Sequence, residues 1–549
     1  MTTPVNRSNR VEADVVVVGG GSAGCVVARR LAESAPRLSV ILLEAGGDGR
    51  GFLVDTPGMT VRLMGNPQSD WLYAAEPDPT AGGRVHYWSG GRMLGGSSAI
   101  NGLVYIRGLR RDYDAWAAEG CSGWSWSEVE PFFRRAEGYE DEGHPSLGKA
   151  GPYAVSQIRS LHPLTQRFIE ACAEIGIPAI EDYNAGVGEG AFANLTSQSR
   201  GRRSSTANRY LAPGSIPTNV QVLTGARVSR IICVDRRAIA VEARVGERIT
   251  EFHARAQIVL SAGTVQSPAI LMRSGIGPAE HLHQLGIALT LDAPGVGANL
   301  QEHSGLTISK FVDQPTYNSE SSGLPALRHL AHYLLLRKGV LASAAVQGMG
   351  WAKSDPALAE PDLHLNWLPY GIDYTVAPPT LHRRPAVSLG VCVSRPHSRG
   401  QIRLRSSSPN DKPVILHRLL DDARDVGVIK RGISLMERVF AASALRPAIV
   451  GPCDPPALLN DEQALEDFVR SHVGIGYHGV GSCRMGTDSV AVVDPALRVR
   501  GIEALRVIDA SVMPRLVSAN TNAASIMIGE KGAALLLADL HMSSGVATS

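Results

Sequence analysis

Residues 14–44 read DVVVVGGGSAGCVVARRLAESAPRLSVILLE, and this stretch decides the fold of the N-terminal part of the chain. Asp14 to Val18 is a Val-rich run, typical of a strand that is buried on both faces of a parallel sheet. Glycines follow at once, Cys25 to Ala35 has apolar residues at helical spacing, and Leu38 to Leu43 is a second apolar run. Strand, glycine turn, helix and strand within about thirty residues predict one βαβ unit.

The turn of this unit carries a dinucleotide-binding fingerprint. Gly19, Gly21 and Gly24 form G-x-G-x-x-G, and Glu44 ends the next strand. The first glycine permits a tight turn, the second lets the backbone approach a pyrophosphate, and the third lets helix and strand pack closely, while the acid accepts ribose hydroxyls. We therefore expect a Rossmann-type domain that binds a cofactor with an ADP half. A glycine turn without a ligand is the weaker alternative, and the fingerprint does not separate NAD from FAD.

Later segments are predicted to complete the same sheet. Gln257 to Ser261 and Leu505 to Ile508 read as short buried strands. Asn522 to Leu540 is small and apolar enough for a helix that packs back on the sheet.

The composition of the chain changes between roughly residues 311 and 470, where His, Trp, Tyr and Pro are more prominent and polar and apolar residues alternate in places. This change indicates a second domain, as expected for 549 residues, because a single core stops growing well below that length. We expect residues 12–310 to form the cofactor domain with some excursions, 311–470 the substrate domain, and 471–549 a segment that returns to the cofactor domain.

Composition excludes several classes of protein. Apolar residues make up 44% and charged residues 19%, which is ordinary for a globular protein. The formal charge is only +2 and the basic residues are scattered, so we expect no nucleic-acid partner. The seven cysteines are odd in number and never form C-x-x-C, which argues against a disulfide framework and a zinc site, and we expect no metal. The first residues, MTTPVNRSNRVEAD, lead into no apolar h-region and no stretch suits a membrane span, so we expect a cytoplasmic protein.

A second glycine-rich segment, Gly90 to Gly102, reads GGRMLGGSSAING. So many small residues indicate a backbone that lies close against something flat or anionic. The alternative is a flexible surface loop, which would not need the apolar residues Met93, Leu94 and Ile100 within it.

This segment resembles the first signature of the glucose-methanol-choline (GMC) oxidoreductases, which are FAD-dependent. Four further segments resemble motifs of the same family in the same order, and the choline-dehydrogenase-like branch is the most similar. These segments are GTVQSPAILMRSGIG (263–277), PGVGANLQEH (294–303, where members commonly have Asp in place of Glu302), YHGVGSCRMG (477–486) and VIDASVMPRLVSANTNAASIMIGEKGA (507–533).

The resemblance implies an α/β fold, in which a Rossmann-type FAD-binding domain is joined to an α+β substrate-binding domain built on an antiparallel sheet. For Asp509 a helix N-cap is an alternative role, and Val228 is expected near the adenine. The positions expected to contact FAD are Gly19, Gly21, Ser22, Ala23, Gly24, Glu44, Ala45, Arg92, Gly95, Gly96, Ser97, Asn101, Gly102, Val104, Val228, Asp509, Ala510 and Ala523.

The resemblance also places His478 at the family's catalytic histidine and Asn522 at its partner position. By itself a lone histidine is more often a packed or surface residue. In the implied reaction a primary alcohol becomes an aldehyde: His478 takes the hydroxyl proton, Asn522 orients the oxygen, and hydride passes to flavin N5. Some members attach FAD through a histidine just before the asparagine of the first signature. This chain has Ile100 before Asn101, so we expect non-covalent FAD.

The substrate alcohol and the electron acceptor, O₂ or another, cannot be read from the residues. Choline is a natural candidate from the branch resemblance. Alternative functions are a hydroxynitrile lyase of the same fold that uses FAD only structurally, an NAD-dependent dehydrogenase, and a flavin-binding module without catalysis. Aromatic side chains of the second domain are expected either to line a pocket over the flavin or to form ordinary core: Trp351, His364, Trp367, Tyr370 and Tyr374.

Overall fold

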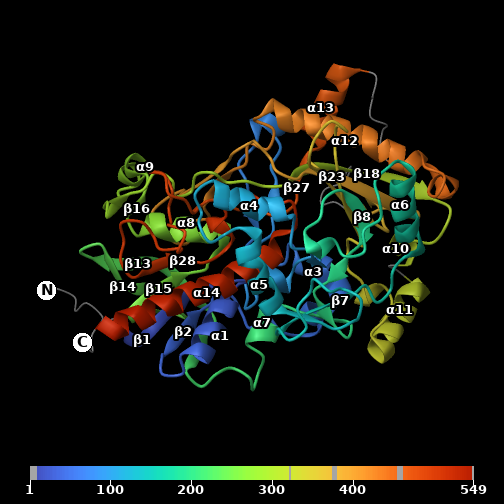
Figure 1. The fold of residues 1–549 in the computed structure, drawn as a ribbon. Coiled ribbons are helices and arrows are strands. Elements are labelled where there is room, and N and C mark those ends of the chain that lie inside the picture. The colour runs from blue at the N-terminus through green and yellow to red at the C-terminus, as the bar shows by residue number, and fades with distance from the viewer. Residues whose placement is uncertain (1–8, 321–322, 374–379, 454–460, 547–549) are drawn as a thin grey trace.

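The Val-rich run forms β1 (Asn9–Val18), which lies inside a seven-stranded sheet between β2 (Val40–Leu43) and β15 (Arg248–Leu260) (Figure 1). β1 is parallel to both neighbours, and Val16 lies opposite Ile41 of β2 and Ile258 of β15. The strand is buried on both faces, as its sequence predicts. The computed structural model describes residues 9–320, 323–373, 380–453 and 461–546.

The strands of this sheet run in the order β12-β2-β1-β15-β14-β13, with β28 also paired to β15. β28 is parallel to β15, with Leu505 opposite Ile258, so the two late segments predicted for this sheet do lie side by side in it. An antiparallel hairpin extends the opposite end of β15. The remaining bounds are β12 (Val220–Leu223), β13 (Ala226–Val234), β14 (Arg237–Val245) and β28 (Leu505–Val507).

Helices α1 (Gly24–Ser34) and α14 (Thr521–Val546) pack against each other beside this sheet (Figure 1). Gly529 of α14 permits close approach, because a Cβ atom there would lie 3.0 Å from the Ala23 carbonyl oxygen and from Val26 Cβ. The fully buried Glu530 carboxylate accepts hydrogen bonds from Arg30 of α1, the shortest at 2.7 Å. The predicted closing helix is therefore present and joins the two ends of the chain.

A second seven-stranded sheet is antiparallel along its whole path β26-β18-β23-β20-β19-β8, with β27 also paired to β18. This confirms the predicted α/β class with a second, antiparallel sheet. Its strands are β8 (Gly190–Ala193), β18 (Ser304–Val312), β19 (Gly348–Ala352), β20 (Leu363–Leu368), β23 (Ala386–Val393), β26 (Ile449–Pro452) and β27 (Gly474–Ile475). They extend outside residues 311–470, and the division into domains stays a prediction.

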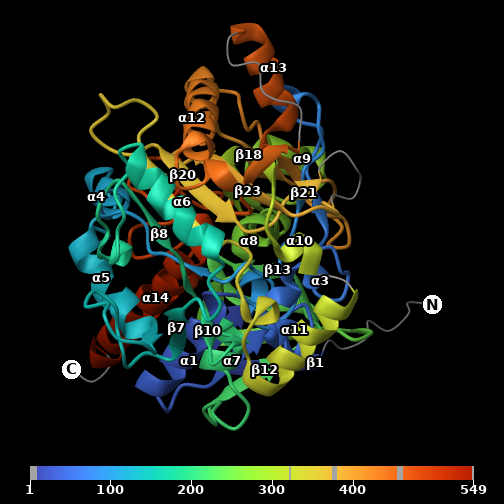
Figure 2. The same cartoon turned by 90° about the vertical axis from the view of Figure 1, so that its right-hand side faces the viewer.

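Helices α6 (Pro163–Glu174) and α12 (Ala423–Ala441) cover one face of the second sheet (Figure 2). The ring of Trp367 on β20 stacks on Phe168 of α6 at 5.1 Å and lies 6.1 Å from Phe440 of α12. Since successive residues of a strand point to opposite faces, His364 points away from these helices, and its ring lies 5.8 Å from that of His303. Further helices are α4 (Arg110–Ala118), α5 (Trp126–Ala136), α8 (Gly263–Arg273), α11 (Gly323–Leu336) and α13 (Glu462–His472).

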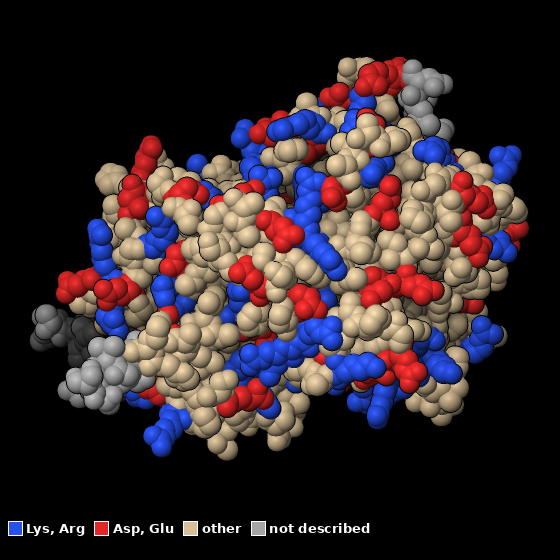
Figure 3. Space-filling view, in the orientation of Figure 1, with Lys and Arg blue, Asp and Glu red and all other residues tan. Residues whose placement is uncertain are grey.

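On the face seen in Figure 3, Lys and Arg are interspersed with Asp and Glu, and no single sign of charge covers it. Among the described helices, none combines the length and the apolar character that a membrane crossing requires.

Candidate active site

A cavity of about 1750 Å³ extends from the end of β1 to the start of α14. Pockets for drug-sized ligands measure about 300–1,000 Å³, so this cavity has room for a large cofactor together with a substrate. Most predicted site residues line it: Gly19, Gly21, Ser22, Ala23, Glu44, Ala45, Gly96, Ser97, Asn101, Gly102, Val104, Val228, His478, Asp509, Ala510 and Asn522.

Four predicted positions do not line the cavity. Gly24 and Gly95 shape the backbone beneath it: a Cβ on Gly24 would lie 1.9 Å from the Gly19 carbonyl oxygen, and the Gly95 N–H donates to the Gly20 carbonyl at 2.7 Å. The Arg92 guanidinium lies over the ring of Trp71, 5.4 Å from its centroid. Ala523 is buried in the first turn of α14.

The fingerprint turn has the geometry that its sequence predicts. Gly19 adopts φ +98°, a left-handed conformation that favours glycine. At Gly21 a Cβ would meet nothing closer than 4.0 Å, so this backbone is open toward the cavity. Helix α1 begins directly after the turn, and its N-terminus supplies the positive end of the helix dipole to a bound anion.

The carboxylate of Glu44 is fixed at the end of β2. Its two oxygens accept from the backbone N–H groups of Gly46 at 2.7 Å and Gly20 at 2.9 Å. Burial raises the pKa of Glu44, although these hydrogen bonds oppose the shift. An acceptor held at this edge of the cavity is suited to bind ribose hydroxyls.

The segment Gly90–Gly102 packs directly on the fingerprint turn, as its small residues predict. Gly96 adopts φ +51°, and a Cβ there would lie 2.7 Å from the Cα of Gly21. A Cβ on Gly91 would in turn lie 2.2 Å from the Gly96 carbonyl carbon. The two glycine-rich segments thus form one wall of small residues along the cavity.

Asp509 holds the loop after β28 and lines the same cavity. Its Oδ1 accepts from the Ser511 N–H at 2.8 Å, which is an N-cap of a short 3₁₀ helix, Ala510–Val512. Its Oδ2 accepts from the Gly263 N–H at 2.9 Å, at the start of α8. The N-cap role is therefore present, and it places the Ala510 backbone at the cavity wall.

These observations together fit FAD. The open backbone at Gly21, the fixed acceptor at Glu44 and the wall of small residues suit a pyrophosphate and a ribose. The cavity continues past them to titratable groups near the start of α14, where a flavin ring and a substrate have room.

His478 lies in the loop after β27. Gly476, two positions before it, leaves room for the His478 ring, and Gly479, directly after it, leaves room for Trp88. A Cβ on Gly476 would lie 2.7 Å from His478 Nδ1, and a Cβ on Gly479 would lie 2.0 Å from the ring of Trp88. Tyr477 adopts φ +61°, which is rare for a non-glycine residue and typical of functional sites. The loop thereby brings the His478 ring to the cavity wall, where it is partly exposed.

Both ring nitrogens of His478 have partners. Nδ1 lies 2.9 Å from Nδ1 of His303, and Nε2 lies 2.8 Å from Nδ2 of Asn520. Burial and the nearby imidazoles of His303 and His364 hold the pKa of His478 well below its usual value. His478 is therefore neutral at ordinary pH, and a neutral imidazole can accept a proton.

Asn520, and not Asn522, lies beside His478. The Asn522 amide is committed elsewhere: Oδ1 accepts from Ser22 Oγ and Nδ2 donates to the Tyr153 hydroxyl, each at 2.9 Å. We predicted Asn522 as the partner of His478, whereas in the structure the side chain at the His478 ring is that of Asn520. The two asparagines are two residues apart, at the point where the loop enters α14 and the chain direction changes.

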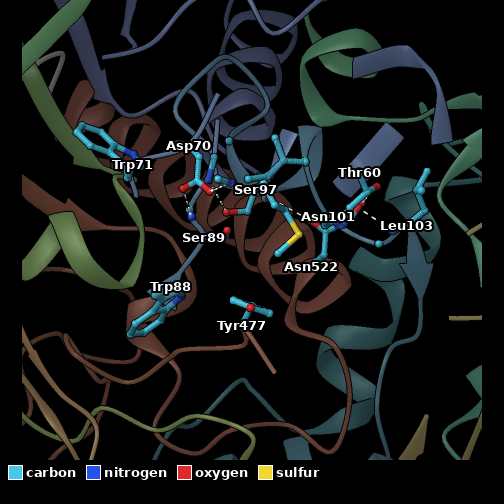
Figure 4. Close-up of a pocket in the computed structure, with 18 of the residues that line it drawn as sticks. Thr60, Asp70, Trp71, Trp88, Ser89, Ser97, Asn101, Leu103, Tyr477 and Asn522 are labelled. Atoms are coloured by element: carbon cyan, nitrogen blue, oxygen red, sulfur yellow. Dashed lines mark hydrogen bonds between the residues drawn. The ribbon is translucent and has the colours of Figure 1, made fainter. Parts of the chain in front are cut away.

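Most of the aromatic residues expected either in a pocket wall or in the core lie in the core. Trp351, His364 and Trp367 are buried and do not line the cavity, whereas Tyr370 does. Tyr374 lies outside the described residues. Sequence reasoning missed other aromatic residues that line the cavity, among them Trp88 and Tyr477, which Figure 4 places across from Asn101 and Asn522.

Two family models match the chain, both described as GMC oxidoreductase, over residues 13–305 and 396–529. An oxygen-dependent choline dehydrogenase of Brucella suis is 36% identical over 524 residues, which cover 95% of each chain.

Solved structures share the whole fold. A pyridoxine 4-oxidase from Mesorbium loti has a TM-score of 0.86 at 30% identity and covers 95% of this chain and 98% of its own. A formate oxidase of Aspergillus oryzae, carrying a mutation studied for its effect on FAD modification, has a TM-score of 0.91 at 25% identity and covers 97% and 99%.

Proposed function

The chain belongs to the GMC oxidoreductase family, and on that premise we propose that it oxidises a primary alcohol to an aldehyde, with His478 as general base and with FAD held non-covalently. As a family member it is an FAD-dependent oxidoreductase acting on CH–OH donors. The observation that carries the finer proposal is the position of the His478 ring at the cavity wall, with Asn520 at its Nε2.

The residues that would hold FAD are those of the fingerprint turn, Glu44, the Gly90–Gly102 segment and the Asp509 loop. Bound FAD supplies the acceptor for the hydride that leaves the substrate carbon. Ile100, which precedes Asn101, has a hydrocarbon side chain and offers no nucleophile for a covalent bond. Ser22 and Tyr153 fix the Asn522 amide beside the fingerprint turn, which supports a cofactor-side role for Asn522.

The proton moves to His478 Nε2. An alcohol hydroxyl that enters the site replaces the Asn520 amide as the donor to Nε2, and Asn520 Nδ2 then donates to the alcohol oxygen. As the carbon-bound hydrogen leaves with its electron pair, Nε2 takes the hydroxyl proton and the carbonyl double bond forms. General-base catalysis of this kind contributes about a hundred- to ten-thousandfold, which is roughly 3–5 kcal/mol of barrier.

We further propose that the substrate is uncharged. Among the described residues the cavity is lined by four carboxylates, and each has partners: Glu44 and Asp509 bind backbone N–H groups, as does Asp70, and Glu320 pairs with Arg328 and His329. These contacts hold all four carboxylates in fixed positions, and none of the four belongs to the 474–480 loop that carries His478. Trp88, Tyr317, Tyr370 and Tyr477 line the cavity and would pack against an aromatic or apolar primary alcohol.

The test is anaerobic mixing of the purified yellow protein with a panel of primary alcohols that includes benzyl alcohol, pyridoxine and choline. Bleaching of the flavin by a neutral aromatic alcohol supports the proposal, and loss of that bleaching in His478→Gln assigns the base. No bleaching by any alcohol would contradict oxidation. Air admitted afterwards distinguishes O₂ from another acceptor by the speed at which the yellow colour returns.

A further inference from the structure

Behind His478, on the side away from the cavity, lies a second imidazole that the proposed reaction does not use. His303 ends the loop before β18 and is fully buried. Its Nδ1 faces Nδ1 of His478 at 2.9 Å, and its Nε2 faces the carbonyl oxygen of Ser394 at 3.1 Å. We propose that His303 is a positioning residue that selects the reactive tautomer of His478, an inference that rests on His478 being the base.

The partners of His303 determine where its proton is. A carbonyl oxygen only accepts hydrogen bonds, so His303 Nε2 must carry the proton and donate to Ser394. Burial lowers the pKa of His303 to about 4, so the ring holds a single proton near neutral pH. Its Nδ1 is therefore unprotonated and acts as an acceptor.

The acceptor at His303 Nδ1 also determines which nitrogen of His478 carries the proton. Nδ1 of His478 faces an acceptor and must be the donor, so it carries the only proton of the neutral ring. Nε2 is left with its lone pair, which accepts from Asn520 Nδ2 in the structure and would accept the proton of an alcohol. With the Ser394 carbonyl as the acceptor of the His303 proton, donation runs from Asn520 to His478 to His303 to Ser394.

The orientation of the His303 ring is itself determined by these contacts. A 180° flip would place C–H groups against both the Ser394 carbonyl and His478 Nδ1. The backbone is held as well, because Glu302 Oε1 accepts from the N–H of His303 at 2.9 Å and from that of His478 at 2.7 Å. One buried carboxyl group thus ties the two histidines together.

His303 also affects the transition state. When Nε2 of His478 takes a proton, the ring becomes an imidazolium in surroundings that already lower its pKa, so the charged form is unfavourable without a partner. The acceptor at His303 Nδ1 then receives a charge-assisted hydrogen bond, which is about twice as strong as a neutral one. The pair is thus arranged to favour the protonated base as it forms.

Three substitutions of His303 test the inference. Asn places its Oδ1 close to the position of the lost Nδ1 and keeps the acceptor. Gln reaches the position of Nε2 and keeps the donor to Ser394, but leaves His478 Nδ1 without an acceptor. Phe keeps the ring and removes both. In serine proteases, loss of the group that fixes the tautomer of the base costs about ten-thousandfold with the geometry intact.

The measurements are the rate of flavin reduction in anaerobic rapid mixing and the ¹H–¹⁵N spectrum of ¹⁵N-histidine-labelled protein with FAD bound, in which the His478 signals are identified by their loss in His478→Gln. We expect Phe and Gln to lower the reduction rate at least a hundredfold with little change in KM, and to move the proton of His478 partly to Nε2. Asn is expected to recover most of the rate and the wild-type tautomer.

Phe and Gln variants with wild-type rates and an unchanged His478 tautomer would overturn the inference. Equal losses in all three variants with the proton still on Nδ1 would also overturn it, since they would indicate packing alone. The proposed function fails separately, when His478→Gln itself reduces flavin at the wild-type rate. In that case the spectrum still decides whether His303 sets the tautomer.

Discussion

Nδ2 of Asn520 lies 2.8 Å from Nε2 of His478, and both side chains reach the cavity from loops that are 42 positions apart in the sequence. Two residues after Asn520, Asn522 points its amide the other way, toward Ser22 and Tyr153. The two asparagine side chains therefore contact different parts of the site.

Asn520→Ala should slow flavin reduction, and Asn522→Ala should weaken FAD binding. Loss of one preorganised donor to a reacting oxygen costs about a hundred- to a thousandfold in rate, and we expect Asn520→Ala to approach the lower figure. Asn522→Ala removes a link to the fingerprint turn, so its bound flavin should be reduced at close to the wild-type rate. Stopped-flow reduction and FAD titration of the apoprotein measure the two effects. Exchanged phenotypes would return Asn522 to the catalytic position.

The rate of flavin reduction should stay level as pH falls from 8 to 6.5. The reaction needs unprotonated His478, and burial with two neighbouring imidazoles lowers the pKa of that ring well below 6.5. A lowered pKa extends the active, neutral form to more acid pH, so the rate should fall only well below pH 6.5. Anaerobic reduction at saturating substrate in buffers of equal ionic strength measures this profile. A midpoint above pH 7 that His478→Gln abolishes would contradict it.

The protein should lose stability between pH 5 and 8 through Glu302. Burial raises the pKa of Glu302 to about 8, although backbone N–H groups oppose the shift. The folded state keeps the proton up to that pH, while the unfolded state releases it near its ordinary pKa, so the folded state is favoured less as pH rises through this window. Thermal unfolding of the FAD-bound protein should show this loss, on the order of a few kcal/mol.

Glu302→Gln provides the matched control, because its amide oxygen can still accept from the His303 and His478 N–H groups. The difference in stability between wild type and this variant should change in favour of the variant as pH rises from 5 to 8. A constant difference over that range would show that Glu302 does not titrate there.

The first sheet could be predicted from the sequence because its signals are local. The run from Asp14 to Glu44 contains strand, turn, helix and acid in one stretch, and the structure forms each of them. The short strands at 257–261 and 505–508 were also recognisable, since buried parallel strands are continuous apolar runs.

The candidate site was harder to predict from the sequence than the first sheet, because its geometry depends on contacts between distant segments. The amide of Asn522 could not be separated from that of Asn520 by spacing, since the direction of each is set by Ser22 and His478 far along the chain. The sequence left open whether Trp351 and Trp367 line a pocket or form core, and both are fully buried, in two different hydrophobic clusters. His303 ends the recognisable segment 294–303. The proposal that it fixes the tautomer of His478 depends on its contact with the Ser394 carbonyl, which the sequence does not indicate.

Acid precipitation should release free yellow flavin into the supernatant, because the side chain before Asn101 is a hydrocarbon. Ile100 follows the 3₁₀ helix Gly96–Ala99 and lines the cavity, so its position faces the proposed cofactor without a nucleophilic atom. Ile100→His supplies the imidazole that some family members use for attachment, at the same place on the same backbone. The wild-type protein should give a colourless pellet. Yellow colour that stays with the pellet of Ile100→His would show that a histidine at this position is sufficient for covalent attachment of FAD. Flavin that stays with the wild-type pellet would show that another side chain forms the bond, and mass spectrometry of the flavin peptide would identify it.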